Sequence, residues 1–119
     1  MLFKIDDKQC RIMFFKCPDT RTVKMKGGGK KRVGIFNTRC NIYIGDDLVG
    51  TGFAEHNPID QYDKVTGKKY ALLRALKFSK SKVERLNVDY EHLRHLSWHF
   101  FVQNFTHIII RRFLQDVKC

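Results

Sequence analysis

Basic side chains give this sequence its clearest chemical potential, and they are concentrated in two segments. Residues 1–32 carry ten basic and three acidic residues, and residues 64–85 carry eight basic residues and one acidic residue. The intervening residues 33–63 carry five acidic residues and a single arginine. Phosphate chains are bound by several cations that converge on one track. The distribution therefore predicts two anion-binding patches rather than a uniform positive coat.

The first patch follows a run of three glycines, Gly27-Gly28-Gly29, which leads into Lys30-Lys31-Arg32. The run lacks the G-x-x-x-x-G-K-[ST] spacing of a nucleotide-binding loop, and no Ser or Thr follows the lysines. We expect a flexible hairpin tip that presents cations to a phosphate backbone or to an acidic protein surface; the alternative is a loop that is merely solvated. The candidate contact residues are Lys24, Lys26, Lys30, Lys31 and Arg32.

The second patch lies at the expected start of a helix, at Gly67-Lys68-Lys69. Helix N-termini favour anions, so two lysines there oppose the helix dipole unless they bind an anion. The candidates here are Lys68, Lys69, Arg74 and Lys77, with a solvated basic face as the alternative. Tyr43 and Tyr62 are candidates for stacking on an exposed base.

Metal and acid–base chemistry have weaker signals. His95 and His99 are spaced i, i+4 and are a weak metal-ligand candidate, but the H-E-x-x-H pattern and a clear third ligand are missing. Asp60 and Asp63 could hold Mg²⁺ in a nuclease, with help from Asp46-Asp47. The simpler interpretation is that these acids belong to a turn and to the start of a helix. We therefore expect a non-enzymatic protein without a cofactor, and keep a metal-dependent nuclease as the alternative.

The composition is that of a folded domain. The chain has 119 residues and a net charge of +11, with 43% hydrophobic and 13% aromatic residues, which excludes a disordered tail. The spacing of Cys10, Cys17 and Cys40 fits no zinc pattern, so we expect reduced thiols buried in a sheet. No apolar run is long enough to span a membrane. No secretory signal is recognised, so we expect a cytoplasmic protein.

The residue pattern changes from strand-like to helix-like near Asn57-Pro58. Strands are predicted at Gln9–Lys16, Thr22–Lys26, Thr38–Ile44 and Leu48–Ala54, with turns at Pro18-Asp19-Thr20 and Gly45-Asp46-Asp47. A helix, or a short turn followed by a helix, is predicted over Ile59–Lys77. A second helix is predicted from a cap at Asn87 or Asp89 to about Val117.

This order predicts a single α+β domain over residues 1–119, mostly β in 1–56 and mostly α in 57–119. An antiparallel sheet of about four strands is followed by two helices packed on one face. The last helix is apolar on several sides, so it should pack across the sheet or contribute to a homodimer interface.

The segment from Thr38 to Lys77 carries Gly50-x-Gly52-x-Ala54, then Asp60-Gln61-Tyr62, then G-K-K-x-A-L-x-x-A-L from Gly67 to Leu76. It resembles a group of small, mostly uncharacterised phage and prophage proteins. It is also loosely similar to double-stranded-RNA-binding domains, in which Lys68 and Lys69 would meet phosphates, and to single-strand-annealing recombinase cores. The likeness covers a third of the chain, and this chain opens with strands where the RNA-binding domain opens with a helix.

A small phage-type protein of this kind also resembles anti-CRISPR inhibitors, which usually act by occupying a surface. A charge of +11 excludes mimicry of an acidic nucleic acid. The resemblance implies a basic binding protein that acts on nucleic acid or on a host ribonucleoprotein. Its favoured role is steric inhibition of a host CRISPR-Cas complex, and a general nucleic-acid-binding accessory protein is the alternative.

Overall fold

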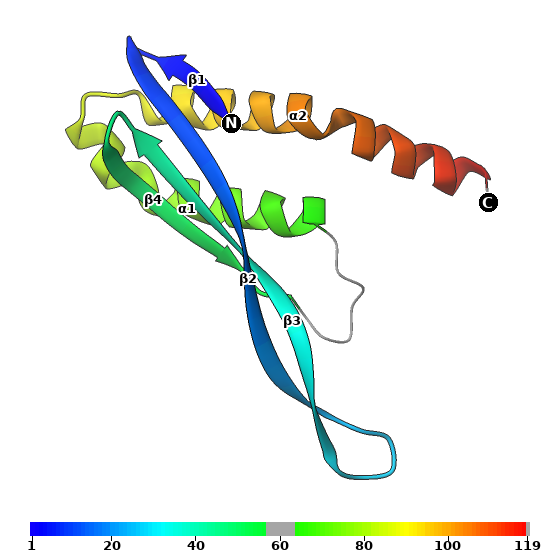
Figure 1. The fold of residues 1–119 in the computed structure, drawn as a ribbon. Helices are drawn as coiled ribbons and strands as arrows, with labels where there is room; N and C mark the ends of the chain where they lie inside the picture. Colours follow the sequence, from blue (N-terminus) through cyan, green and yellow to red (C-terminus); the bar gives the residue numbers. More distant parts are fainter. Residues whose placement is uncertain (57–63, 119) are drawn as a thin grey trace.

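A computed structural model describes the backbone of residues 1–56 and 64–118 and the side chains of residues 1–56 and 65–105. One antiparallel sheet of four strands, in the order β1-β2-β3-β4, precedes two helices (Figure 1), which confirms the predicted α+β class. The elements are β1 Leu2–Ile5, β2 Lys8–Lys24, β3 Lys30–Ile44, β4 Asp47–Ala54, α1 Lys64–Arg85 and α2 Tyr90–Lys118.

The first two predicted strands are a single strand, so the turn predicted at Pro18-Asp19-Thr20 is wrong. Strand β2 runs unbroken from Lys8 to Lys24 and pairs with β3 from Cys10 to Lys24. Met25 donates its backbone N–H to Gly29, and hydrogen-bonded and non-hydrogen-bonded pairs alternate from there. Pro18 faces Phe36 in a non-hydrogen-bonded pair, where a residue's N–H would point away from β3. A proline is therefore accommodated without the loss of a ladder bond.

Strand β1 was not predicted from the sequence. Because two of the four predicted strands are one strand, β1 brings the number of strands back to four. Leu2–Ile5 pairs with the start of β2 through a turn at Asp6-Asp7, and both aspartates have positive φ. Short polar side chains tolerate this left-handed conformation. Phe3 and Ile5 are buried against the helices, so β1 adds apolar surface to the inner face of the sheet.

Strand β3 begins at Lys30, eight residues before the predicted strand, whereas β4 agrees with its prediction within one residue. The β3–β4 connection is the expected turn, with Gly45 at φ 60°. Because β4 ends at Ala54, opposite Thr38, the far half of β2 and β3 continues without a third strand beside it.

Helix α1 lies directly on β4, and two glycines make this approach possible. A Cβ built on Gly52 would lie 2.2 Å from the Ala71 carbonyl oxygen, and one on Gly50 would lie 2.4 Å from the Ala75 carbonyl oxygen. Ala71 and Ala75 are themselves fully buried, and their small side chains allow the close approach. The Gly-x-Gly of the motif quoted above therefore has a packing role in this fold.

Helix α1 extends eight residues beyond the predicted end at Lys77. Ser79 and Val83 are fully buried and continue the inward stripe of the helix through a polar-looking segment. The Ser79 hydroxyl donates to the Leu76 carbonyl, which satisfies it in the core. The helix ends where Asn87 adopts a positive φ of 59°. Ile59, the start of the predicted segment, lies outside the described residues. The expectation that the helix starts at Gly67 is wrong: α1 already includes Lys64, so Lys68 and Lys69 lie beyond its first turn.

Helix α2 begins as predicted, because Asp89 caps it. The Asp89 carboxylate accepts the backbone N–H groups of Glu91, at 3.0 Å, and His92. The helix packs against the inner face of β1 and β2 through aromatic rings: Phe100 stacks on Phe3 with centroids 5.0 Å apart, and Phe101 meets Phe14 edge-on. Both helices thus lie on one side of the sheet (Figure 1).

Candidate nucleic-acid interface

The longest projection from the body is a two-stranded ribbon formed by residues 17–37, here called the arm (Figure 1). It contains eight cross-strand pairs, so it extends roughly 25–30 Å beyond the end of β4. Its tip holds three successive glycines with φ near 90°, a conformation that few other residues adopt. The arm is continuous with the sheet because the same two strands build both.

The five arm cations predicted from the sequence are all exposed, but most lie on strands rather than in a loop. Only Lys26 is in the tip; the others belong to the strand ends, where Lys24 faces Lys30 directly. Like charges placed opposite each other on a ribbon are destabilising. Within the described part of the chain, no carboxylate forms an ion pair with Lys24, Lys26, Lys30, Lys31 or Arg32.

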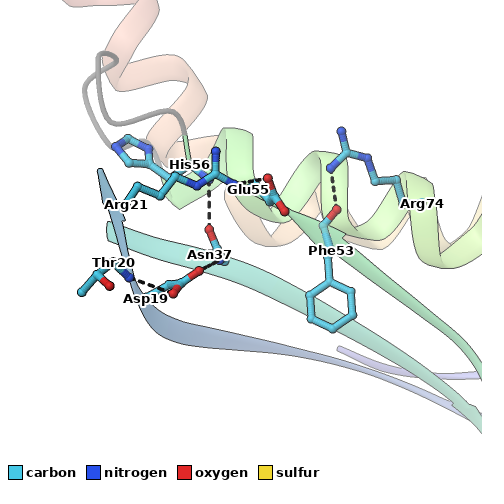
Figure 2. A network of polar contacts seen from close by, with 8 residues as sticks. All are labelled: Asp19, Thr20, Arg21, Asn37, Phe53, Glu55, His56 and Arg74. Carbon is cyan, nitrogen blue, oxygen red and sulfur yellow. Dashed lines mark hydrogen bonds and ion pairs between the residues drawn. The ribbon is translucent and has the colours of Figure 1, made fainter. Parts of the chain in front are cut away.

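Polar contacts hold the base of the arm against the end of β4 (Figure 2). The Asp19 carboxylate accepts hydrogen bonds from the Thr20 backbone N–H and from the Asn37 side-chain amide. The Asn37 amide oxygen accepts the backbone N–H of His56, and Arg21 forms an ion pair with Glu55. These contacts cross from both arm strands to the residues after β4, so they fix the direction in which the arm leaves the body.

The side of the sheet opposite the helices carries cations and aromatic rings. Alternate residues point to this outer face, which includes Leu2, Lys4, Gln9, Arg11, Met13, Phe15, Arg39, Asn41, Tyr43, Thr51 and Phe53. Arg11 lies over the ring of its cross-strand neighbour Tyr43, with its guanidinium carbon 4.7 Å from the ring centroid. Arg39 lies over Phe15 at the same distance. Three members are cations and none is acidic.

The four helix candidates do not form one patch. The Lys68 ammonium lies between two rings, 5.7 Å from the Phe14 centroid and 4.9 Å from the Phe105 centroid. Lys69 lies near the Tyr70 ring, and Lys77 is exposed. Arg74 donates to the Phe53 carbonyl at the outer edge of β4, while the Phe53 ring points away from α1 (Figure 2). Lys68 and Lys69 thus lie near the base of the arm, whereas Arg74 binds the edge strand β4.

The two tyrosine candidates have different outcomes. Tyr43 lies on the outer face, half-buried under Arg11, and its hydroxyl accepts a hydrogen bond from the Asn41 amide at 3.2 Å. Tyr62 lies outside the described residues. Arg11, Phe15 and Arg39 are not among the candidates predicted from the sequence, although their every-second-residue spacing with Met13 and Asn41 indicates that they share one side of a strand.

The remaining candidates for chemistry have little support. Asp60 and Asp63 lie outside the described residues; Asp46 lies in the β3–β4 turn, and Asp47 is the first residue of β4, paired with Ile44. His95 and His99 are both exposed on α2, and among residues 1–56 and 65–105 no cluster of three metal-ligating side chains occurs. Cys10 and Cys40 are buried in the sheet as expected, and this burial raises the pKa of each thiol to about 12; Cys17 is only half-buried.

Comparisons with known proteins add no relative. No family model matches the chain, and neither the curated proteins nor the solved structures contain a significant match. Within its described residues, neither helix is long and apolar enough to cross a membrane.

Proposed function

We propose that this protein binds nucleic acid without chemistry, with the arm following the phosphate backbone. The observation that carries the proposal is the cluster of exposed cations at the end of the arm, which includes the facing pair Lys24 and Lys30 and has no carboxylate partner in the described structure. The Lys24–Lys30 pair is held close by the ribbon at a cost in repulsion, and phosphates placed between such side chains would relieve it.

The stiffness of the arm supports the same conclusion. The backbone pairing of β2 with β3 and the contacts at the base of the arm hold the backbone that carries the cations in place before binding. Little conformational entropy is therefore lost when the cations bind a phosphate chain. Two-stranded ribbons are among the elements that contact nucleic-acid grooves and backbones.

The proposal is tested by filter binding at low salt with the variant Lys30→Gln/Lys31→Gln. We expect its affinity for a labelled oligonucleotide to fall about tenfold or more. Two phosphate contacts of roughly 1 kcal/mol or less each are lost, and the positive electrostatic field of the arm is weakened. The matched control, Lys80→Gln/Arg85→Gln, removes the same charge from exposed positions on the C-terminal half of α1. Equal losses in both variants, or no retention of wild-type complexes, would contradict the proposal.

The narrower role implied by the phage-protein resemblance, steric inhibition of a host CRISPR-Cas complex, stays a prediction. A basic arm serves free nucleic acid and a guide-loaded ribonucleoprotein equally well. Purification of the tagged protein from host lysate separates the two: recovery of a Cas protein would support the inhibitor, and recovery of bulk nucleic acid alone would contradict it.

A further inference from the structure

The outer face of the sheet differs from an ordinary solvated sheet surface. Antiparallel sheets with one face in water usually place small polar residues on it. Here Met13 and Phe53 are exposed by 38% and 52%, beside Phe15 and Tyr43. Apolar side chains grouped on an uncovered face indicate a binding surface rather than a solvated one.

Two guanidinium–ring pairs occupy this face. Arg11 and Tyr43 are direct cross-strand partners, and so are Arg39 and Phe15. In each pair one side of the guanidinium plane is held by a ring at 4.7 Å, and within the described residues no carboxylate pairs with either arginine. A guanidinium held in this way offers its other side to a planar group and its N–H donors to an anion.

Arg39 is the most constrained of these cations. It lies between its cross-strand neighbours Phe15 and Phe53, and its Nε is buried without a hydrogen-bond partner in the described structure. Because a buried N–H without an acceptor costs free energy, Arg39 holds this position at a cost in stability. The Phe53 ring beside it is half-exposed and points away from the helices (Figure 2).

A polar row separates the two pairs. Thr51 donates its hydroxyl proton to the Asn41 amide oxygen at 3.0 Å, and Asn41 donates to the Tyr43 hydroxyl at 3.2 Å. The Tyr43 hydroxyl keeps its own proton for a further acceptor. The row thus supplies hydrogen-bonding groups between two stacking positions that are four residues apart along β2, roughly 13 Å.

From these observations we infer that the outer face binds the unstacked bases of a single-stranded nucleic acid, on the guanidinium–ring pairs Arg11–Tyr43 and Arg39–Phe15 and on Phe53. Planar bases stack on arginine planes and aromatic rings, and the cations complement the phosphates between them. A duplex does not fit, because its bases stack on each other and its grooves admit a ribbon rather than a four-stranded sheet. This inference rests on the proposed function and names its substrate class.

The test uses three fluorescent probes of one length: oligo-dT, an oligomer of the same phosphates with abasic sites throughout, and a duplex. Fluorescence anisotropy measures the affinity of the full chain for each at one salt concentration. We expect tighter binding to oligo-dT than to the abasic oligomer, on the order of tenfold for each base that stacks. Oligo-dT should also bind more tightly than the duplex.

Two variants assign the effect to the face. Phe53→Ala removes an exposed ring, and Arg39→Lys keeps the charge but removes the planar guanidinium. Each should lower affinity for oligo-dT at least about fivefold and leave the abasic oligomer unchanged. The matched control Phe78→Ala removes a ring that is 69% exposed on α1, and it should change neither affinity.

The outcomes separate this inference from the proposed function. Equal wild-type affinity for oligo-dT and the abasic oligomer would overturn base stacking while leaving nucleic-acid binding intact. Tighter binding to the duplex than to oligo-dT would also overturn base stacking and leave nucleic-acid binding intact. So would a Phe53→Ala or Arg39→Lys variant that binds oligo-dT as tightly as the wild type. Binding to none of the probes would overturn the proposed function itself.

Discussion

Burial divides the three cysteines that the structure describes, Cys10, Cys17 and Cys40, into two chemical classes. Cys10 and Cys40 are fully buried on the inner face of the sheet, and desolvation disfavours their thiolates. Cys17, at the base of the arm, is only half-buried. The reactive form of cysteine is the thiolate, so the two classes should differ in modification rate.

Alkylation by iodoacetamide at pH 8 should therefore modify Cys17 but spare Cys10 and Cys40 in the folded protein. With a pKa of about 12 rather than 9.0, each buried thiol has a thiolate fraction roughly a thousandfold smaller. Peptide mapping by mass spectrometry reads each site separately, and the protein unfolded in urea is the control in which all three react. Rapid labelling of Cys40 without urea would contradict its placement in the core.

Among the elements, the contact of α1 with β4 depends on the absence of two side chains. The backbone of α1 lies so close to Gly50 and Gly52 that any Cβ would meet helix backbone atoms rather than a movable side chain. This contact also places the N-terminal end of α1, with Lys68, at the base of the arm. The position of the helix relative to the candidate interface is therefore set by packing.

Gly52→Ala should lower the free energy of unfolding by about 1–3 kcal/mol, because α1 must move to admit the new methyl group. Urea denaturation followed by circular dichroism measures the free energy of unfolding. Gly34→Ala is the matched control: it lies on the arm with open space around it and should change stability by less than about 0.5 kcal/mol. A neutral Gly52→Ala would show that α1 does not approach β4 this closely.

The elements also show what local sequence can and cannot predict. Runs of β-formers and the later helical period were enough for the α+β class, the β3–β4 hairpin and the Asp89 cap. The turn predicted at Pro18 and the helix end predicted at Lys77 were wrong because tertiary context decides both. Pro18 lies in a non-hydrogen-bonded pair with Phe36, and Ser79 is buried with the Leu76 carbonyl as its hydrogen-bond acceptor. Local propensity contains neither fact.

At the scale of the whole molecule, the positive side chains of the proposed binding surface lie in two places. The arm presents lysines at the end of a ribbon, and the outer face presents arginines on rings. Composition and spacing were enough to name the arm cations and Tyr43 as candidates, and their binding of nucleic acid stays a prediction. The guanidinium–ring pairs were not, because Arg11 and Tyr43 meet only through the register of β2 with β3.

The continuity of arm and face suggests one binding track along β2 and β3 (Figure 1). If phosphates are neutralised along this track, counterions are released and affinity must fall as salt rises. A protein target recognised mainly through apolar contacts would show a much weaker dependence.

The most direct test of nucleic-acid binding is the salt dependence of the wild-type affinity for a single-stranded oligonucleotide, followed by fluorescence anisotropy from low to physiological salt. With each neutralised phosphate contributing roughly −0.7 to the slope of log affinity against log salt, contacts from the five arm cations predict a slope of about −3 to −4. The Lys30→Gln/Lys31→Gln variant should be shallower by about 1.4. A slope near zero, or identical slopes for the two proteins, would contradict the assignment of the arm to a phosphate backbone.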